Sequence, residues 1–461
     1  METFTDPARH AGACYAAANF AQLGDTLGYG RSAGRYHHHG SVKRVWFHPL
    51  CRRAPQVLPA PFDHPLLARE EAPVTGLNAL AFTGGRASLL EALAGVSDPR
   101  KKRGIRHQIA PTLAMVAAAG LSGSGRSFRS AGDFVADLPQ EALARLGARF
   151  HPVRRCYIAP DEATIRRHVQ MTGADQADAV VGAWLLAQVR AGRLAAGQAA
   201  SRTMVALDGK VLKGAWEELP DVKVKLFSAL VHGEGVIIGQ RKVPGDTTEV
   251  TQVLPLTGDI AAARPPAAGG AAGGDGDCDL AGLVLTADAP HVHRDNLQQV
   301  AGRGGEHIVT VKGNQPSLER DIAALFPEGP ASGDFPPHHV TFDRGRGRSE
   351  IRSIWASPHV AGLDADILAG NRGHWQVENR EHYVRDKTFD EDRSQVRTGS
   401  SPQFPATARN IAISLLRLAG CVNIARGLEH LSRRLDCVLA LLGVLPKRPR
   451  KEVMRTPGLC R

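Results

Sequence analysis

The spacing of apolar residues divides the chain near residue 200. From residue 88 to 196, apolar positions recur at helical spacing in several consecutive segments, and one helix is predicted to start at Asp161 with acids in its first turn, as the helix dipole favours. Residues 1–85 show no clear period and are rich in Gly, Pro, Arg and His, which indicates a disordered or poorly ordered leader. The pattern therefore predicts a leader followed by a small all-helical domain over residues 86–198.

Beyond residue 200 the apolar residues fall into short runs of the kind that form buried strands. Strands are predicted for residues 203–210, 223–232, 235–244, 282–288 and 306–316, and a hairpin for 338–357. Helical segments separate or follow several of these strands. The order of elements indicates an α/β domain with a mixed sheet flanked by helices over residues 200–443, and a basic tail over 444–461.

Acidic residues stand at the ends of two predicted strands, Asp208 and Asp288. Acids in this position usually sit at a sheet edge that faces a ligand. For a single aspartate, capping of a turn or of the next helix is the better explanation. A second acid-bearing element decides between these interpretations.

That element is the segment 371–398. His374, Glu378, His382 and Asp386 follow one another at four-residue spacing, so they share one face of a helix. A polar face of this kind is either a solvated surface or one wall of a site. Two upstream aspartates on neighbouring strands favour the second interpretation.

Three carboxylates on two strands and a packed helix can hold two divalent cations about 4 Å apart. Oxygen ligands suit Mg²⁺ or Mn²⁺, and such a pair activates an attacking water or 3′-hydroxyl and stabilises the leaving oxygen in phosphodiester cleavage. Lysines near the strand ends could meet phosphates. These are Lys210, Lys213 and Lys312.

Three local patterns allow other interpretations. The H-x3-E-x3-H spacing of His374, Glu378 and His382 could bind a transition metal, although such a site needs a further ligand. The acidic run 390–392 is typical of a solvated or capping segment. Trp375, which precedes the glutamate, is expected to pack rather than to stack on a base.

Composition adds a weak indication of a nucleic-acid partner. The net charge is +11 and the pI about 9.5, with an excess that is mostly arginine, whose planar fork suits phosphate. The seven cysteines form no CxxC pair, so neither a disulfide framework nor a zinc knuckle is indicated, and a reducing cytoplasm is expected. No run of 18 apolar residues occurs, so no membrane span is predicted.

Several motifs resemble the DDE transposases of bacterial insertion sequences, in particular the ISAs group that includes the H-repeat-associated proteins. The resemblance runs from about residue 88 to 443. It is carried by LSGSGRSFRSAGDFVADLP, ALDGKVLKGA, LVLTADAPHVHRDN, HIVTVKGNQPSL and, most specifically, GHWQVENREHYVRDKTFDEDRSQVRTG.

The resemblance implies an RNase H-like core and an N-terminal helical domain that binds transposon ends. It assigns the catalytic, metal-binding acids to Asp208, Asp288 and Glu378, acting with two Mg²⁺ ions. Phosphate-binding candidates around the glutamate are His374, Arg380 and Arg385. The implied partners are the terminal inverted repeats and target DNA, the implied assembly at synapsis is a homodimer, and the implied location is the cytoplasm with nucleoid association.

One departure from the family's pattern bears on activity. The segment between the hairpin and the glutamate helix is shorter than the family's, which suggests an internal deletion near 363–366. The alternative function is therefore an inactive, truncated transposase remnant that only binds DNA. An unrelated Mg²⁺-dependent nuclease on the same core is a third hypothesis.

Overall fold

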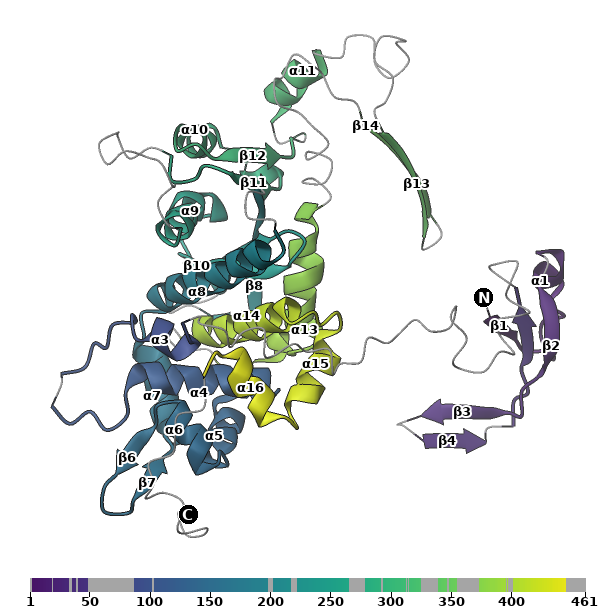
Figure 1. Cartoon of the computed structure of the whole chain (residues 1–461). Helices are drawn as coiled ribbons and strands as arrows, with labels where there is room; N and C mark the ends of the chain where they lie inside the picture. Colours follow the sequence, from purple (N-terminus) through teal and green to yellow (C-terminus); the bar gives the residue numbers. More distant parts are fainter. Residues whose placement is uncertain are drawn as a thin grey trace. The chain divides into compact units, whose positions relative to one another are not determined.

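The structure is a computed structural model of the chain (Figure 1). It describes residues 2–18, 20–32, 35–38, 40–48, 87–101, 103–197, 202–216, 222–264, 278–291, 293–311, 313, 315–324, 339–345, 348–354, 373–394, 396 and 401–444. The chain forms two compact units, residues 1–73 and 74–461, which are described separately. No helix among the described residues is long and apolar enough to cross a membrane.

The first unit contains short strands that its sequence pattern did not indicate. Its elements are β1 (Glu2–Thr5), α1 (Ala13–Ala17), β2 (Ala21–Asp25), β3 (Tyr29–Ser32), β4 (Arg35–His38) and β5 (Arg44–Phe47). β5 is the central strand of a three-stranded sheet with β1 and β2, and β3 pairs with β4. The Trp46 side chain is buried and donates its indole N–H to Thr5 Oγ1 at 2.9 Å. Strands this short give too few alternating positions for a period to be visible.

The second unit begins with a helical layer. Its helices are α3 (Leu89–Leu93), α4 (Ile109–Leu121), α5 (Phe128–Ala136), α6 (Gln140–Arg145), α7 (Glu162–Met171) and α8 (Ala174–Ala195). Asp161 caps α7 by accepting a hydrogen bond from the Thr164 amide at 2.7 Å, as the sequence predicted. α4 is buried on almost every side, which explains its apolar composition.

The helical layer is not all-helical, because a β-hairpin interrupts it. β6 (Arg149–His151) pairs antiparallel with β7 (Cys156–Ile158). The residues of the connecting turn include Arg155, whose φ of 52° is the left-handed conformation common in hairpin turns. Three-residue strands carry little periodicity, so the sequence pattern missed them.

A five-stranded mixed sheet follows, with the order β10-β9-β8-β11-β12 (Figure 1). Its strands are β8 (Thr203–Trp216), β9 (Lys223–Val231), β10 (Val236–Val243), β11 (Leu283–Ala287) and β12 (Glu306–Val309). β8, β9 and β10 are antiparallel neighbours, whereas β8, β11 and β12 run parallel. The predicted α/β class with a mixed sheet is therefore correct.

The remaining elements connect or cover this sheet. They are η3 (Glu249–Gln252), α9 (Val253–Ala262), η4 (Ala289–His291), α10 (Arg294–Gly302), α11 (Pro316–Ala324), the paired strands β13 (His339–Gly345) and β14 (Arg348–Ile354), η6 (Glu378–His382), α13 (Tyr383–Lys387), η7 (Glu391–Arg393), α14 (Gln403–Leu418), α15 (Ile424–Leu431) and α16 (Leu435–Leu441).

One continuous core joins the helical layer to the sheet, and its buried side chains run from Leu89 to Val444. α8 lies against β10 at close range, because a Cβ at Gly182 would overlap the carbonyl oxygen of Ile238. α14 contacts α4, α8 and β10. The helical layer and the sheet therefore belong to one compact unit rather than two separate ones.

Candidate functional site

The aspartates predicted at strand ends lie on adjacent strands of the sheet. β8 and β11 are parallel and in register, with Leu207 paired to Ala287. Asp208 and Asp288 are the next residues on the two strands, and the backbones of paired strands lie about 4.8 Å apart. The register therefore brings the two acidic residues side by side where β11 ends.

The strand that carries Asp208 is longer than predicted. β8 continues to Trp216 instead of ending in a turn at residue 210, because β9 keeps pairing with it through Val211 and again at Trp216. Asp208 consequently lies within a strand, and its Oδ1 accepts the Gly209 amide at 2.8 Å. Asp288, in contrast, directly follows the last residue of β11, Ala287.

A further carboxylate, Glu249 of η3, approaches Asp208. A Cβ at Gly209 would overlap the Glu249 carboxylate, so only glycine leaves room for it. Burial raises the pKa of Asp208 to about 7, and the negative charges of Glu249, Glu381 and Glu378 contribute to the rise. Asp208 is thus a half-buried acid with other negative charges nearby.

The helical segment 373–387 is fixed to the same two strands. His374 Nδ1 lies 3.3 Å from Thr286 Oγ1 of β11, and His382 Nδ1 lies 3.6 Å from Asp208 Oδ2 of β8. Asp386 Oδ2 accepts a hydrogen bond from Lys210 Nζ at 2.7 Å. Three of the four residues on the predicted polar face therefore contact the sheet.

The fourth member of that face is Glu378, an exposed residue between His374 and His382. It begins η6, a π-helical turn in which the Tyr383 amide bonds to the Glu378 carbonyl. In a 3.6-residue helix a four-residue spacing drifts steadily around the axis, and a wider turn offsets that drift. The π turn thus keeps the four-residue face in line with the strands.

The donor chemistry of this region suits a hard cation, but the oxygens are not gathered into one coordination shell. Among the residues that the structure describes, no three His, Cys, Asp or Glu side chains lie close enough together to hold a metal ion. The described side chains therefore form no preassembled metal site, either from the three candidate acids or from the H-x3-E-x3-H residues.

The lysines and arginines predicted to meet phosphates occupy different environments. Lys210 is buried in its pair with Asp386, whereas Lys213 is exposed and pairs with Asp392 at 2.6 Å. Arg380 is half-buried and donates to the Gly233 carbonyl. Lys312 lies outside the described residues.

Arg385 has no exposed surface, and this changes the interpretation of the residue. Its guanidinium donates to Glu391 at 2.8 and 3.0 Å, to Glu381 at 3.0 Å and to Gln240 at 3.2 Å. A side chain whose donors are used in the interior cannot also contact a DNA phosphate in this conformation. Its place in the structure is that of an internal ion-pair partner.

Glu391 forms the other half of that ion pair and is not solvated, although it belongs to the acidic run 390–392. It also accepts a hydrogen bond from Arg409 at 2.9 Å. Burial alone would raise the pKa of Glu391, but the two guanidinium groups of Arg385 and Arg409 hold it below its ordinary value. The sequence interpretation of this run as a solvated surface is wrong at Glu391.

Trp375 also differs from its expected environment. It was expected to pack, yet 65% of the residue is exposed, as is 59% of Tyr383 on the same helical segment. Both aromatic residues belong to the segment that carries Glu378.

Two features of the site had no clear sequence signal. Glu249 was not among the predicted site residues, and nothing in the sequence marked its approach to Asp208. His232 at the end of β9 places Nε2 3.0 Å from Thr286 Oγ1, so a single threonine contacts both His232 and His374. Such contacts depend on strand register, which the sequence does not specify.

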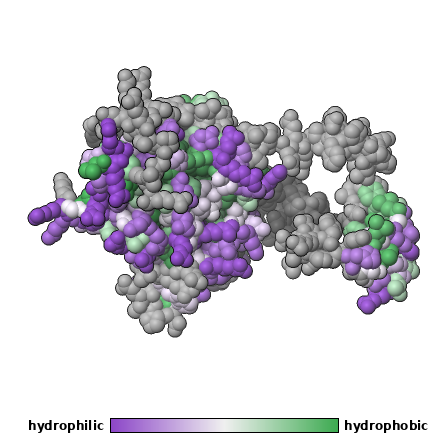
Figure 2. Space-filling view, turned by 90° about the horizontal axis from the view of Figure 1, so that it is seen from below, coloured by the Kyte–Doolittle hydropathy of each residue, from purple (hydrophilic) through white to green (hydrophobic). Residues whose placement is uncertain are grey.

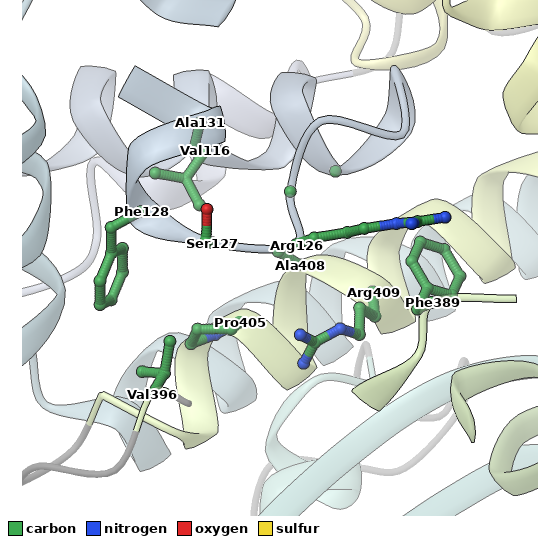
Figure 3. Close-up of a pocket in the computed structure, with 12 residues that line it drawn as sticks. Val116, Arg126, Ser127, Phe128, Ala131, Phe389, Val396, Pro405, Ala408 and Arg409 are labelled. Carbon is green, nitrogen blue, oxygen red and sulfur yellow. The ribbon is translucent and has the colours of Figure 1, made fainter. Parts of the chain in front are cut away.

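A small pocket lies between the helical layer and α14 (Figure 3). Phe128, Pro405 and Phe389 surround it with apolar atoms, and Arg126 and Arg409 reach its edge. Its volume of about 20 Å³ is enough for one water molecule. None of the three candidate acids lines it.

Comparison with known proteins agrees with the motifs. Residues 90–185 match the family described as DDE_Tnp_1-associated. The H repeat-associated putative transposase YhhI of Escherichia coli K12 is 23% identical over 260 residues, which cover 47% of this chain and 64% of that protein. The Putative transposase YncI of Escherichia coli O157:H7 is 21% identical over 271 residues, covering 49% and 64%.

The chain is similar to transposases at low identity. It spans less than two thirds of the length of these curated relatives. A synaptic complex of the piggyBac transposase with hairpin DNA aligns with 82% of this chain and 83% of that one, at 10% identity and a TM-score of 0.34, a similarity too low to support an argument.

Proposed function

We propose that the chain is a transposase of the ISAs group that binds the ends of an insertion sequence and catalyses strand cleavage and strand transfer. One observation carries the proposal: β8 and β11 place Asp208 and Asp288 in adjacent register, and the segment bearing Glu378 is fixed to those same strands. The five-stranded sheet would then be the RNase H-like core. The similarity to transposases supports the same function.

The three acids fit a pair of Mg²⁺ or Mn²⁺ ions in their chemistry. Burial raises the pKa of Asp208 and the neighbouring negative charges add to the rise, and a bound cation would favour the ionised carboxylate. Asp208, Asp288 and Glu378 would hold the ions. When bound, such a pair activates the attacking oxygen and stabilises the leaving oxygen of a phosphodiester.

His382 and Lys210 would position the acids rather than react. Burial lowers the pKa of His382 to about 3, and the charges of Arg385 and Lys210 contribute, so the imidazole beside Asp208 is neutral at pH 7. A neutral ring can hold the carboxylate in place without competing with a cation for its charge. Lys210 holds the helical segment on β8 through Asp386.

The partners in this proposal are the terminal inverted repeats and target DNA, with two copies of the chain acting together at synapsis. The helical layer over 86–198 would bind the element ends. Exposed or half-buried residues near the acids, namely Lys213, His374 and Arg380, would contact phosphates. A protein with this role would act in the cytoplasm, in association with the nucleoid.

A second candidate function is DNA binding without cleavage. The observation that favours it is that no three potential metal ligands converge within the part of the chain that the structure describes. A protein of this kind would recognise element ends and leave the strands intact.

A cleavage assay distinguishes the two. Purified protein is incubated with Mg²⁺ and a duplex carrying the inverted repeats that flank its gene, or with a shuffled duplex of equal length. A transposase cleaves only at the repeat end, whereas a remnant binds the repeat without cleaving it. Equal cleavage of the two duplexes would instead identify a general nuclease and overturn the proposal.

A further inference from the structure

The β6–β7 hairpin and the neighbouring loop carry arginines and lysines that the proposed chemistry does not use. Exposed cations lie in the loop 97–108, on the hairpin and on α7. They are Lys101, Arg103, Arg106, Arg149, Arg154 and Arg167. Figure 1 shows the hairpin beside α6 and α7 at the lower edge of the second unit, and Figure 2 views that unit from below, where hydrophilic residues cover much of the described surface.

The hairpin is held rigidly. Phe150 and Tyr157 are paired across the two strands, with ring centroids 5.2 Å apart. The Gln140 side chain of α6 bonds to both backbone groups of Tyr157, accepting its N–H at 2.6 Å and donating to its carbonyl at 3.1 Å. The hairpin therefore presents its cations from a fixed platform, which reduces the entropy lost on binding.

The turn of the hairpin is also fixed and points outward. The Arg154 amide donates to His151 Nδ1 at 3.1 Å, which closes the turn. Val153 beside it is 85% exposed. Arg155 adopts the left-handed φ of 52° that hairpin turns commonly require.

The loop 97–108 is attached to α7 on the same side. Arg100 Nη1 lies 2.7 Å from His168 Nε2 of α7, and Arg100 Nη2 donates to the His107 carbonyl at 2.8 Å. Burial lowers the pKa of His107, and the positive charge of Arg149 of β6 lowers it further, as do those of Arg100 and Arg106. Arg100 thus joins the loop to α7.

The acids of this surface are already engaged. Asp98 pairs with Arg100 at 2.7 Å, Asp161 caps α7, and Glu162 lies 3.5 Å from Arg166. By contrast, within the described residues no ion pair is recorded for Lys101, Arg103, Arg106, Arg149 or Arg154. The surface therefore keeps an excess of positive charge.

We propose that the loop 97–108, the β6–β7 hairpin and α7 form one surface that binds the phosphate backbone of duplex DNA, with the hairpin turn at a groove. A two-stranded ribbon is narrow enough to enter the major groove, and arginine binds phosphate through two oxygens. This proposal rests on the proposed function. It adds to that function the residues through which a transposase of this kind would contact DNA.

Salt titration of DNA binding tests the surface. The probe is a duplex of about 20 base pairs, roughly two helical turns, of arbitrary sequence. The affinity of full-length protein is measured against salt concentration for wild type and Arg149→Ala/Arg154→Ala. The salt slope is the slope of the logarithm of the binding constant against the logarithm of the salt concentration. Each lost phosphate contact lowers the magnitude of this slope by about 0.9, so we expect it to be lower by about 1.8 in the double variant. Its affinity at low salt should fall by at least about tenfold.

Two further variants serve as controls. Arg433→Ala/Arg434→Ala removes the same charge from exposed positions of another region and should leave the slope unchanged. Arg149→Lys/Arg154→Lys keeps the charge and should retain most of the slope. If Arg149→Ala/Arg154→Ala keeps the wild-type slope, or loses no more than the control double variant, the surface is not the binding site. Binding of an RNA duplex in place of DNA would also overturn it.

The outcome is separable from that of the proposed function. If the wild-type protein binds DNA through the hairpin but does not cleave repeat ends, the proposal for the surface is supported and the transposase proposal is wrong. If the wild-type protein cleaves repeat ends and Arg149→Ala/Arg154→Ala keeps the wild-type salt slope, only the proposal for the surface is wrong.

Discussion

Arg385 is the residue whose environment departs most from expectation. It is fully buried between two carboxylates, Glu381 and Glu391, and Glu391 is shared with Arg409. A buried ion pair need not add stability, because both charges lose their hydration. Removing one partner is costly, however, because it leaves the other charge buried without compensation.

We therefore expect Arg385→Leu to lower the free energy of unfolding by about 3–5 kcal/mol. Urea denaturation followed by circular dichroism measures this. Arg433→Leu is the matched control, since Arg433 is 75% exposed and a surface substitution changes stability by about 0.5 kcal/mol or less. A loss at Arg385 no larger than that of the control would show that the two carboxylates find other partners and that the pairing is dispensable.

At the scale of elements, docking of the segment 373–387 on β8 depends on few polar contacts. Lys210 is only 7% exposed and its ammonium pairs with Asp386, one turn beyond the contact of His382 with Asp208. If this pair fixes the segment, the effects of removing its two members are not additive.

A double-mutant cycle with Lys210→Met and Asp386→Asn should give a coupling energy of about 0.5–3 kcal/mol in the free energy of unfolding. The exposed pair of Lys213 with Asp392 provides a comparison, and its coupling should lie nearer the 0–1 kcal/mol of surface pairs. Additive effects at Lys210 and Asp386, within about 0.3 kcal/mol, would mean that the contact does not hold the segment in place.

The elements also show where sequence reasoning succeeds and fails. Short apolar runs predicted the buried strands β9, β10 and β11, because burial on both faces of a strand selects apolar residues at consecutive positions. The β6–β7 hairpin was missed since each strand has three residues. The length of β8 was underestimated because its second half is stabilised by pairing with β9, a tertiary contact.

In the candidate site, too, local features were predicted from the sequence and contacts between distant segments were not. Asp208 and Asp288 were singled out by a local signal, an acid after an apolar run, and Glu378 by the four-residue spacing of its helix face together with the resemblance to DDE transposases. Glu249 and the contact of Thr286 with His374 were not found, because they arise from register and close approach between distant segments. Burial of Arg385 was equally invisible, since a charged residue is exposed by default.

At the scale of the whole molecule, a buried polar network links the helical layer to the glutamate segment. Asp178 of α8 accepts a hydrogen bond from Gln240 of β10 at 3.1 Å, and Gln240 Oε1 accepts one from Arg385 and one from Asn410 of α14. Gln403 also donates to Asp178. The helical layer and the candidate site are therefore parts of one packed structure.

This network has a pH signature. Burial raises the pKa of Asp178 to about 7, far above its ordinary value near 4, so the folded state binds a proton that the unfolded state has released. The stability from Asp178 is therefore full below pH 4 and is lost as the pH rises to about 7.

Asp178→Asn removes this titration and keeps groups that can bond to Gln240 and Gln403. We expect the stability of the variant relative to wild type to increase from pH 5 to pH 7 and then to level off. Thermal unfolding at a series of pH values measures the difference between the two proteins, in which the other titrating groups cancel. Parallel curves for the two proteins would show that Asp178 is ionised in the folded state.

The central claim is that Asp208, Asp288 and Glu378 act together as one metal-dependent site. The most direct measurement is the Mg²⁺-dependent cleavage rate of repeat-end DNA by Asp208→Asn, Asp288→Asn and Glu378→Gln, with the exposed Asp321→Asn as control. Each of the three should lose more than about 100-fold, the upper range for residues that only support a metal ligand, while still binding DNA. Cleavage by any of the three at the rate of wild type and the control would contradict the claim.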